Sequence, residues 1–335
     1  MNHRLAALLF IALWGHAVFA ANDISVARAV VGGEFDYVVR KGDTLTSIGA
    51  RFGVSEKNLA RENRLVQPYR LRPGNQLKVS NLHVVPGELS DGVLINIPQR
   101  MLFFFRDAKV VSAYPVALGR HDWQTPTGEF FIRSREKDKT WLVPPSIQEE
   151  MRLAGKPILT RVPPGPDNPL GGYWMGLSLV GYGMHGTNVP ASIYRMRTHG
   201  CIRLHPDDAE ALYGQVSLNM PVKIIYAPVL VAALTDRPIL VEVNPDVYNR
   251  GIDALGHLRE IARAQGLEQH IDWTMAARVA REKDGVARPA GDAVPGREAG
   301  SNERTIARNE RESTTVYPVG RLARAGGGCF AAGPR

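Results

Sequence analysis

From residue 92 to residue 134 the chain consists of short apolar runs that are separated by polar turns. The runs are VLINIP, MLFFF, VVSAYPVAL and GEFFIRS. Turn-forming residues stand between them at 98–100, 106–107 and 125–128. Several short strands joined in this way are typical of a barrel or a sandwich. We therefore expect a mostly β domain in this part of the chain.

The segment YVVRKGDTLTSIGARFGVSEKNLARENRLVQPYRLRPGNQLKVS predicts a second, much smaller domain. Its start, 37–40, has the pattern of a strand, and the turn at 42–44 supplies N-cap side chains for a helix. Gly53 suits the left-handed residue that ends a helix. Ser55 can cap a second helix, and a closing strand is expected at 76–79. The order of these elements predicts a compact βααβ domain.

The chain beyond the β-rich domain changes character twice. DRPILVEV, at 236–243, has the pattern of a strand, and apolar residues recur at helical spacing in 251–266. A second helix is expected at 272–283. From about residue 285 no hydrophobic period remains, so we expect disorder there.

At 335 residues the chain is long enough for several folded units. The expected fold class is multi-domain, with a βααβ domain, a mostly β domain and a strand-and-helix extension. We divide the chain into a signal peptide at 1–20, a linker at 21–34, the βααβ domain at 35–80, a second linker at 81–91, the β domain at 92–227, the extension at 228–283 and a disordered basic tail at 284–335.

The first residues, MNHRLAALLFIALWGHAVFA, have the composition of a secretory signal. Arg4 precedes an apolar stretch at 5–14, and small residues near the end suit cleavage after Ala20. The apolar stretch is too short to span a bilayer comfortably, and no later segment is apolar for long enough. We expect an exported chain that has no transmembrane segment after cleavage.

The chain has only two cysteines, Cys201 and Cys329. Two cysteines in an oxidising compartment usually pair. Cys329 lies in the irregular segment RAGGGCFAAGPR, however, where a disulfide would contribute little to a folded core. Pairing therefore stays open, but it does not explain why Cys201 stands in MRTHGCIRLHP.

The stretch THGCIRL has the groups that nucleophilic cysteine chemistry needs. If it is one continuous strand, His199, Cys201 and Arg203 share a face, because side chains alternate. His185 or His199 can promote formation of the thiolate. The amides of Gly200 and Cys201 can stabilise an oxyanion, and Arg203 can bind a carboxylate.

Two families resemble this chain, and the first is the lysin-motif (LysM) family over 37–80. The matching residues are GDTLTSIGARFGVS, the region of Asn63, and LRPGNQLKV. That family binds glycans that contain N-acetylglucosamine. The resemblance implies glycan binding by Gly42, Asp43 and Thr44, together with a loop at about 65–71. A domain of this fold can also lack sugar binding.

The β-rich domain resembles the L,D-transpeptidase catalytic domain family. The matching motifs are TPTGEF (125–130), GPDNPLGGYWMGLSL (165–179), HGT (185–187) and THGCIRL (198–204). In that family a cysteine attacks the peptidoglycan stem peptide between the L-centre of the diamino acid at position three and the terminal D-alanine. D-alanine leaves, a thioester forms, and an amine resolves it. Many members have Asn where this chain has Arg203, and the Arg form resembles the Gram-negative envelope branch.

The resemblance assigns roles to individual residues. Cys201 is the nucleophile and His185 is the general base, with its ring oriented by a backbone carbonyl near Gly186. His199 lines the site, and Gly200 forms an oxyanion hole with Cys201. The substrate-binding candidates are Arg203, Thr198, Tyr173 and Trp174. Carbapenems are expected to acylate Cys201, because their strained carbonyl resembles the acyl donor.

The resemblance also implies partners and a compartment. The expected partners are peptidoglycan glycan strands and tetrapeptide stems, in the periplasm, and an envelope lipoprotein is a candidate acyl acceptor. A net charge of +8 suits an anionic polymer. Nucleic acid is not expected, because no block of like charges is interleaved with aromatic residues. No cofactor is expected.

Several alternatives remain open from the sequence. Water could replace the amine as acceptor, which would make an L,D-carboxypeptidase. The protein could be a non-catalytic wall-binding protein in which Cys201 is inert or oxidised. A zinc hydrolase could use His185, His199, Cys201 and His205 as ligands, although the usual CxxC pairing is absent. Arg203 could simply pair with Asp207 or Asp208 at the next turn.

Overall fold

The structure, a computed structural model, describes residues 27, 29–235 and 237–294. The predicted signal peptide at 1–20 and most of the predicted basic tail, including Cys329, lie outside the described residues. Within the described ranges, no helix is both long enough and apolar enough to cross a membrane.

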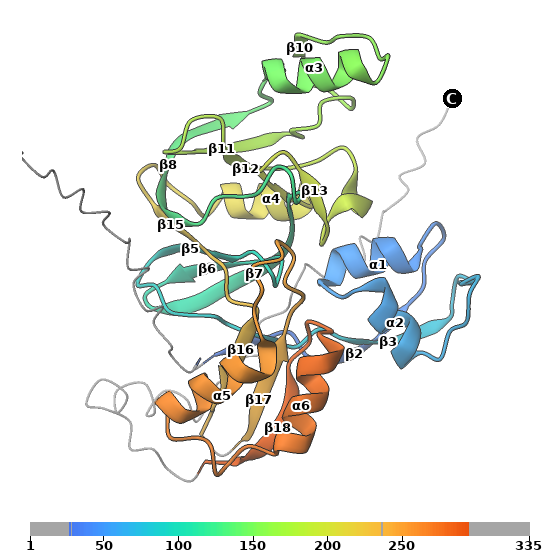
Figure 1. Ribbon diagram of the computed structural model, residues 1–335. Coiled ribbons are helices and arrows are strands. Elements are labelled where there is room, and N and C mark those ends of the chain that lie inside the picture. Colours follow the sequence, from blue (N-terminus) through green and yellow to red (C-terminus); the bar gives the residue numbers. More distant parts are fainter. Residues whose placement is uncertain (1–26, 28, 236, 295–335) are drawn as a thin grey trace, which may run out of the picture.

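The centre of the protein is a closed β-sheet (Figure 1). Its strands are β5 (Gly92–Asn96), β6 (Met101–Arg106), β7 (Lys109–Gly119), β8 (Gly128–Lys137), β11 (Tyr173–Leu177), β12 (Gly183–His185), β13 (Met196–Thr198), β14 (Ile202–Leu204) and β15 (Pro221–Ile225). They follow the order β13-β7-β14-β12-β11-β8-β15-β5-β6, and β6 also pairs with β7, which closes the sheet into a barrel. Helix α4 (Pro206–Tyr213) follows β14. The prediction of a mostly β domain is confirmed.

Strand β6 shows why the run MLFFF has no polar residues. Leu102 and Phe104 belong to the cluster inside the barrel, whereas Phe103 and Phe105 belong to a second cluster on its outer face. That outer cluster also contains Ala50 of the small N-terminal domain. Burial of each phenylalanine stabilises the fold by about 1.5–3 kcal/mol. The barrel and the N-terminal domain therefore both contribute residues to this outer apolar cluster.

The N-terminal domain has the predicted βααβ order. It consists of β2 (Glu34–Val38), α1 (Leu45–Phe52), α2 (Glu56–Glu62) and β3 (Gln76–Ser80), with β2 and β3 antiparallel. Thr44 and Ser47 form a reciprocal capping box at the start of α1. Gly53 ends α1 in the left-handed conformation, at φ 71°, as predicted. Helix α1 packs against η1 (Pro190–Ser192) of the barrel domain.

The C-terminal part is a folded unit. Strands β16 (Val229–Ala232), β17 (Pro238–Val243) and β18 (Arg288–Ala293) form an antiparallel sheet, and α5 (Ala254–Ala264) and α6 (Trp273–Glu282) pack against it. The predicted strand and both predicted helices are confirmed. The predicted disorder from 284 is wrong for 284–294, because β18 pairs with β17 there. Its sequence, RPAGDA, has no β-branched residue and gave no strand signal.

The two predicted linkers are also partly structured. Strand β1 (Val30–Val31) pairs antiparallel with β4 (His83–Val84). The segments expected to be linkers, 21–34 and 81–91, are therefore hydrogen-bonded to each other through these two strands. His83 is fully buried, and its ring contacts the Gly53 carbonyl and Glu242 of β17, each at 3.1 Å. Two-residue strands have too few positions to show an alternating pattern, which is why the sequence did not reveal them.

One excursion leaves the barrel between β8 and β11. It contains β9 (Trp141–Leu142), α3 (Pro145–Leu153) and β10 (Arg161–Val162). Helix α3 buries none of its residues. In Figure 1 it lies at the top, opposite α5 and α6 at the bottom. The helix therefore has no core of its own.

Candidate active site

The candidate catalytic side chains lie on the outer face of the barrel. Alternate residues of β11, β12 and β14 belong to or pack against the interior cluster, namely Tyr173, Met175, Leu177, Met184, Ile202 and Leu204. The residues between them, Trp174, His185 and Arg203, therefore point outward. These three also form one row, because His185 pairs in register with both Trp174 and Arg203.

His185 is buried in a defined orientation. Its ring stacks on Trp174, with centroids 5.8 Å apart, and its Nδ1 lies 2.7 Å from the Gly186 carbonyl oxygen. A carbonyl oxygen can only accept, so Nδ1 carries the proton and Nε2 keeps its lone pair. Burial, with a smaller effect from the positive charge of Arg203, lowers the pKa of His185 to about 4. The ring is therefore a neutral base at physiological pH.

Cys201 lies at the break between β13 and β14. The structure corrects the expectation of one continuous THGCIRL strand, because Gly200 adopts φ +103° and interrupts it. A Cβ at Gly200 would lie 2.6 Å from the Tyr182 ring, so glycine is required at this position. The half-buried Cys201 Sγ lies 3.6 Å from the Gly181 carbonyl oxygen.

The thiol and the imidazole are both neutral at rest. Burial raises the pKa of Cys201, and a Gly183 N–H and the Arg203 charge act in the opposite direction. The low pKa of His185 has the same consequence, since the ring does not hold a proton at neutral pH. Before the reaction Cys201 is therefore a thiol and His185 a neutral imidazole, and the two do not form a thiolate–imidazolium ion pair.

Arg203 is close enough to influence both reacting groups. Its charge lowers the pKa of His185 and of Cys201. Its Nη1 donates to the Ser192 hydroxyl at 3.0 Å, and its buried Nε has no acceptor among the described residues. Asp207 lies near His205, whose Nδ1 is 3.7 Å from the Asp207 carboxylate. The guanidinium of Arg203 therefore places a positive charge beside both reacting groups.

His199 has a different setting from His185. Its Nε2 lies 2.9 Å from Glu150 of α3, and its ring meets Trp123 edge-on at 5.1 Å. Glu150 also accepts a hydrogen bond from Arg120 at 2.8 Å. His199 therefore borders the site and ties the excursion to it.

The two oxyanion candidates are not equivalent. The Gly200 N–H donates to the Thr198 hydroxyl at 3.2 Å, and that hydroxyl donates to the Cys201 carbonyl at 2.6 Å. The N–H of Cys201 has no backbone or side-chain acceptor in the described ranges. The free donor is thus the amide of Cys201 itself.

Two predicted substrate contacts are separated by the pleat of β11. Trp174 stacks on His185 and lies on the catalytic face. Tyr173 points to the other face, where it donates to Glu210 at 2.9 Å and packs against Tyr213. The structure therefore does not bring Tyr173 to the site, because neighbouring residues of a strand point in opposite directions.

The motif GPDNPLGGYW owes its form to a buried asparagine. The side-chain amide of Asn168 donates to the carbonyls of Lys139, Val162 and Pro163, and its oxygen accepts from the Leu170 N–H. Asn168 therefore holds the two ends of the excursion together. The sequence shows the motif but not which residue organises it.

The candidate glycan loops of the N-terminal domain are exposed, but two of the predicted side chains have local partners. Asp43 accepts from the Tyr37 hydroxyl and the Arg40 N–H, both at 2.7 Å. Thr44 caps α1. These contacts stabilise the turn. The exposed surface is the backbone around Gly42 and positions 66–68 and 70 of the second loop, since Leu65, Tyr69 and Leu71 pack against the core of the domain.

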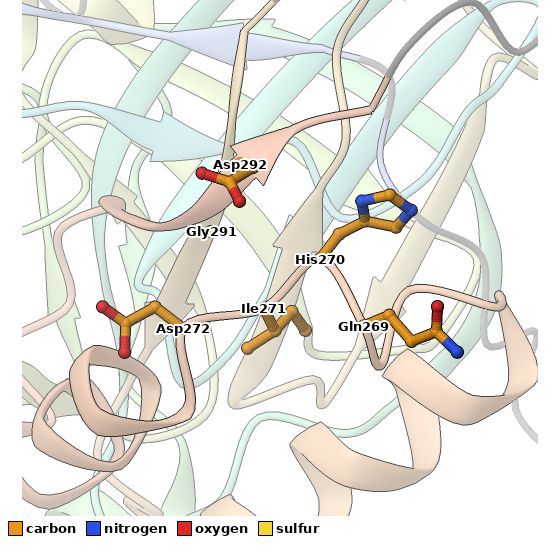
Figure 2. A pocket seen from close by; sticks show the side chains of 6 residues that line it. All are labelled: Gln269, His270, Ile271, Asp272, Gly291 and Asp292. Atoms are coloured by element: carbon orange, nitrogen blue, oxygen red, sulfur yellow. The ribbon is translucent and has the colours of Figure 1, made fainter.

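A cavity of about 230 Å³ lies elsewhere, between the α5–α6 connection and β18 (Figure 2). Its lining residues are Gln269, His270, Ile271, Asp272, Gly291 and Asp292. It shares no residue with the catalytic face. Asp272 is already the N-cap of α6. Among the described residues, no three His, Cys, Asp or Glu side chains are grouped to hold a metal ion.

A barrel with a thiol, a buried neutral imidazole and a guanidinium at neighbouring strands has the groups of a cysteine acyl-transfer site. Residues 90–224 match the L,D-transpeptidase catalytic domain family, and residues 37–80 match the LysM domain family. The chain is 31% identical over 223 residues to the probable L,D-transpeptidase YcfS of Escherichia coli, covering 65% of this chain and 70% of that protein. It is 33% identical over 172 residues to the putative L,D-transpeptidase YkuD of Bacillus subtilis, covering 51% of this chain and 87% of that one. The chain belongs to the L,D-transpeptidase family.

Solved structures are also similar at low identity. L,D-transpeptidase 3 of Mycobacterium tuberculosis matches with a TM-score of 0.33 and 16% identity, over 60% of this chain and 95% of that one. The Ldtfm–avibactam carbamoyl enzyme matches with a TM-score of 0.34 and 22% identity, over 42% of this chain and 50% of that one. The matched part thus spans about half of the second protein.

Proposed function

We propose that the protein is an exported peptidoglycan L,D-transpeptidase. The observation that carries the proposal is the orientation of His185, whose Nδ1 donates to the Gly186 carbonyl so that Nε2 carries the lone pair of the ring. A cysteine nucleophile requires such a base when its own pKa is raised, as that of Cys201 is.

The reaction follows from these groups. His185 Nε2 takes the Cys201 thiol proton while Sγ attacks the carbonyl between the diamino acid and the terminal D-alanine. The Cys201 N–H stabilises the oxyanion, and His185 returns the proton to the leaving D-alanine amine. An acceptor amine then attacks the thioester, loses a proton to His185 and displaces the thiolate. Arg203, whose charge acts on both reacting groups, binds a substrate carboxylate.

The acceptor sets the biological product. An amine on a second stem gives a 3-3 cross-link, and an amine on an envelope lipoprotein gives its attachment to the wall. Water gives an L,D-carboxypeptidase, and an inert Cys201 would leave a wall-binding protein. Among these alternatives we favour transfer to an amine, because the similar proteins YcfS and YkuD are described as L,D-transpeptidases.

The N-terminal domain is proposed to bind the glycan whose stem peptides react. The LysM match and the exposed loops around Gly42 and at 65–71 support this role. Tethering to one strand raises the local concentration of stems near Cys201. The proposed location is the periplasm, reached through the signal peptide at 1–20.

Incubation of the protein with a disaccharide-tetrapeptide tests the proposal. Release of D-alanine together with a dimeric product is expected. D-alanine with a tripeptide product alone would identify the carboxypeptidase. Unchanged substrate under conditions where the protein binds glycan would reject both enzymes.

Glu150→Gln is expected to shift the products from transfer toward hydrolysis by roughly two- to fivefold. Glu150 accepts from both Arg120 and His199 and is the tie between α3 and the site. The pKa of Glu150 is lowered first by Arg120 and then by His199, so the carboxylate is charged during turnover. Without that charge, water reaches the thioester more often. The measurement is the ratio of dimer to tripeptide.

Glu149→Gln is the matched control for this prediction. It removes the same charge one residue earlier, where the carboxylate pairs only with exposed Arg152. Its product ratio is expected to equal that of the unmodified protein. Equal ratios for the two variants would show that Glu150 does not control access of water.

A further inference from the structure

A tyrosine from the C-terminal part reaches the catalytic loop. Tyr248 follows β17, beyond the residues that match the catalytic domain family, yet it is buried with the barrel core. Its hydroxyl accepts from the Thr125 N–H at 2.9 Å and donates to the Gly119 carbonyl at 3.0 Å. The segment after β17 therefore fixes the start of the TPTGEF motif.

Thr125 continues the connection to the nucleophile. Its hydroxyl accepts from the Gly119 N–H at 2.9 Å and donates to the Gly200 carbonyl at 3.0 Å. Each hydroxyl in this network has one proton to donate. Tyr248 uses its proton on Gly119, and Thr125 uses its proton on Gly200. The two carbonyls can only accept, so these hydroxyls are their donors.

The Gly200 carbonyl belongs to the same peptide unit as the Cys201 N–H. In a trans peptide these two groups point in opposite directions within one plane. Holding the carbonyl toward Thr125 therefore aims the Cys201 N–H away from Thr125. Among the described residues that N–H has no acceptor, so it is available to an oxyanion.

Gly200 makes this restraint necessary. At φ +103° it lies in a region that few residues adopt and has no side chain to hold it. The Thr198 hydroxyl fixes the next carbonyl, that of Cys201, at 2.6 Å. Two threonine hydroxyls thus restrain the consecutive carbonyls on either side of the nucleophile.

Tyr248 is itself held in place. Its ring stacks on Tyr226 at 5.7 Å, and its backbone N–H donates to the Tyr226 hydroxyl at 2.9 Å. Tyr226 donates to Asp246, which also accepts from the N–H groups of Gly251 and Ile252. The loop that presents Tyr248 is therefore ordered by its own contacts.

We infer that Tyr248 and Thr125 are positioning residues, which aim the Cys201 N–H at the oxyanion of the acylation step. The inference rests on the proposed function, since it concerns the same site. It makes the C-terminal segment a part of the catalytic machinery and not only a neighbouring unit.

The test compares two reactions of the same thiol. Acylation by a disaccharide-tetrapeptide passes through an oxyanion, whereas alkylation by iodoacetamide forms a thioether and iodide without one. Tyr248→Phe and Thr125→Val are expected to slow acylation by roughly ten- to a hundredfold through misplacement of the donor. The rate of alkylation and the KM for the muropeptide are expected to stay unchanged.

Two further variants separate positioning from packing. Thr125→Ser keeps the hydroxyl and is expected to retain most of the acylation rate that Thr125→Val loses. Tyr114→Phe is the matched control, because Tyr114 is buried in the same cluster but accepts from Gln215 instead of the Thr125 N–H. It is expected to acylate like the unmodified protein.

The outcomes are distinct. Parallel loss of acylation and alkylation, or equal acylation by Tyr248→Phe and the unmodified protein, would overturn the inference. Equal rates for Thr125→Ser and Thr125→Val would also overturn it. Failure of the unmodified protein to acylate while it still alkylates would instead reject the proposed function, and the inference with it.

Discussion

His185→Gln is expected to slow acylation of Cys201 by about 10²–10⁴-fold, the usual contribution of a general base. Glutamine can preserve much of the packing against Trp174 but has no basic nitrogen. The thiol of Cys201, with its raised pKa, would then have to lose its proton to water. The measurement is the single-turnover rate of thioester formation. His257→Gln is the control, since His257 is a half-buried histidine of α5 that pairs with Glu260.

The pH dependence of the acylation rate is a second test of His185 as the general base. Because the pKa of His185 is lowered to about 4, its Nε2 stays unprotonated down to that pH. The acylation rate is expected to fall with a midpoint near the lowered value and not near the ordinary histidine pKa of about 6.5. Acid also destabilises the fold here, because the unfolded chain protonates His185 first. Rates are therefore normalised to the folded fraction. An acidic limb at the ordinary value would contradict the assignment of His185 as the buried base.

Glu242→Ala is expected to lower the free energy of unfolding by about 3–5 kcal/mol, the usual effect of breaking a buried pair. Glu242 and His83 are both fully buried, and their side chains lie 3.1 Å apart. The carboxylate also accepts from the Val84 N–H at 2.7 Å and from the Gln99 amide at 3.0 Å. Its removal takes the acceptor from the Val84 N–H and leaves the Gln99 side-chain amide donating to the Val84 carbonyl.

The position of this pair explains the size of the effect. The second nitrogen of His83 lies 3.1 Å from the Gly53 carbonyl oxygen, which can only accept, so this nitrogen donates to it. The network therefore joins the N-terminal domain, the barrel and β17. Denaturant unfolding measures the change. Glu260→Ala, which removes an exposed carboxylate paired with His257, is expected to change stability by less than about 0.5 kcal/mol. Equal midpoints for the two variants would show that the junction does not depend on the pair.

Local sequence patterns predicted much of the secondary structure. The caps Thr44 and Ser55 and the stop at Gly53 placed α1 and α2, and helical spacing placed α5 and α6. The short apolar runs predicted the barrel strands, because alternating burial leaves its mark on each strand separately. The β1–β4 and β17–β18 pairings escaped notice, since their strands are short or lack β-branched residues.

The site was predictable only as far as its motif extends. HGT and THGCIRL marked His185 and Cys201, but neither motif indicates that β13 and β14 are broken at Gly200. Glu150 and Tyr248 gave no sequence signal, because their contacts with His199 and Thr125 join distant parts of the chain. Tyr173 and Trp174 are neighbours in the motif, but they lie on opposite faces of β11, and the sequence does not show which face fills the barrel. Long-range contacts of this kind are a property of the folded chain and not of any local pattern.

Intact-mass spectrometry during reaction with a disaccharide-tetrapeptide tests the central claim most directly. The unmodified protein is expected to gain the mass of the muropeptide minus D-alanine, and the adduct should be absent from Cys201→Ala. Addition of an amine acceptor should discharge the adduct into a cross-linked product. An adduct on Cys201→Ala, or no adduct and no D-alanine from a protein whose thiol is titratable, would contradict acyl transfer through Cys201.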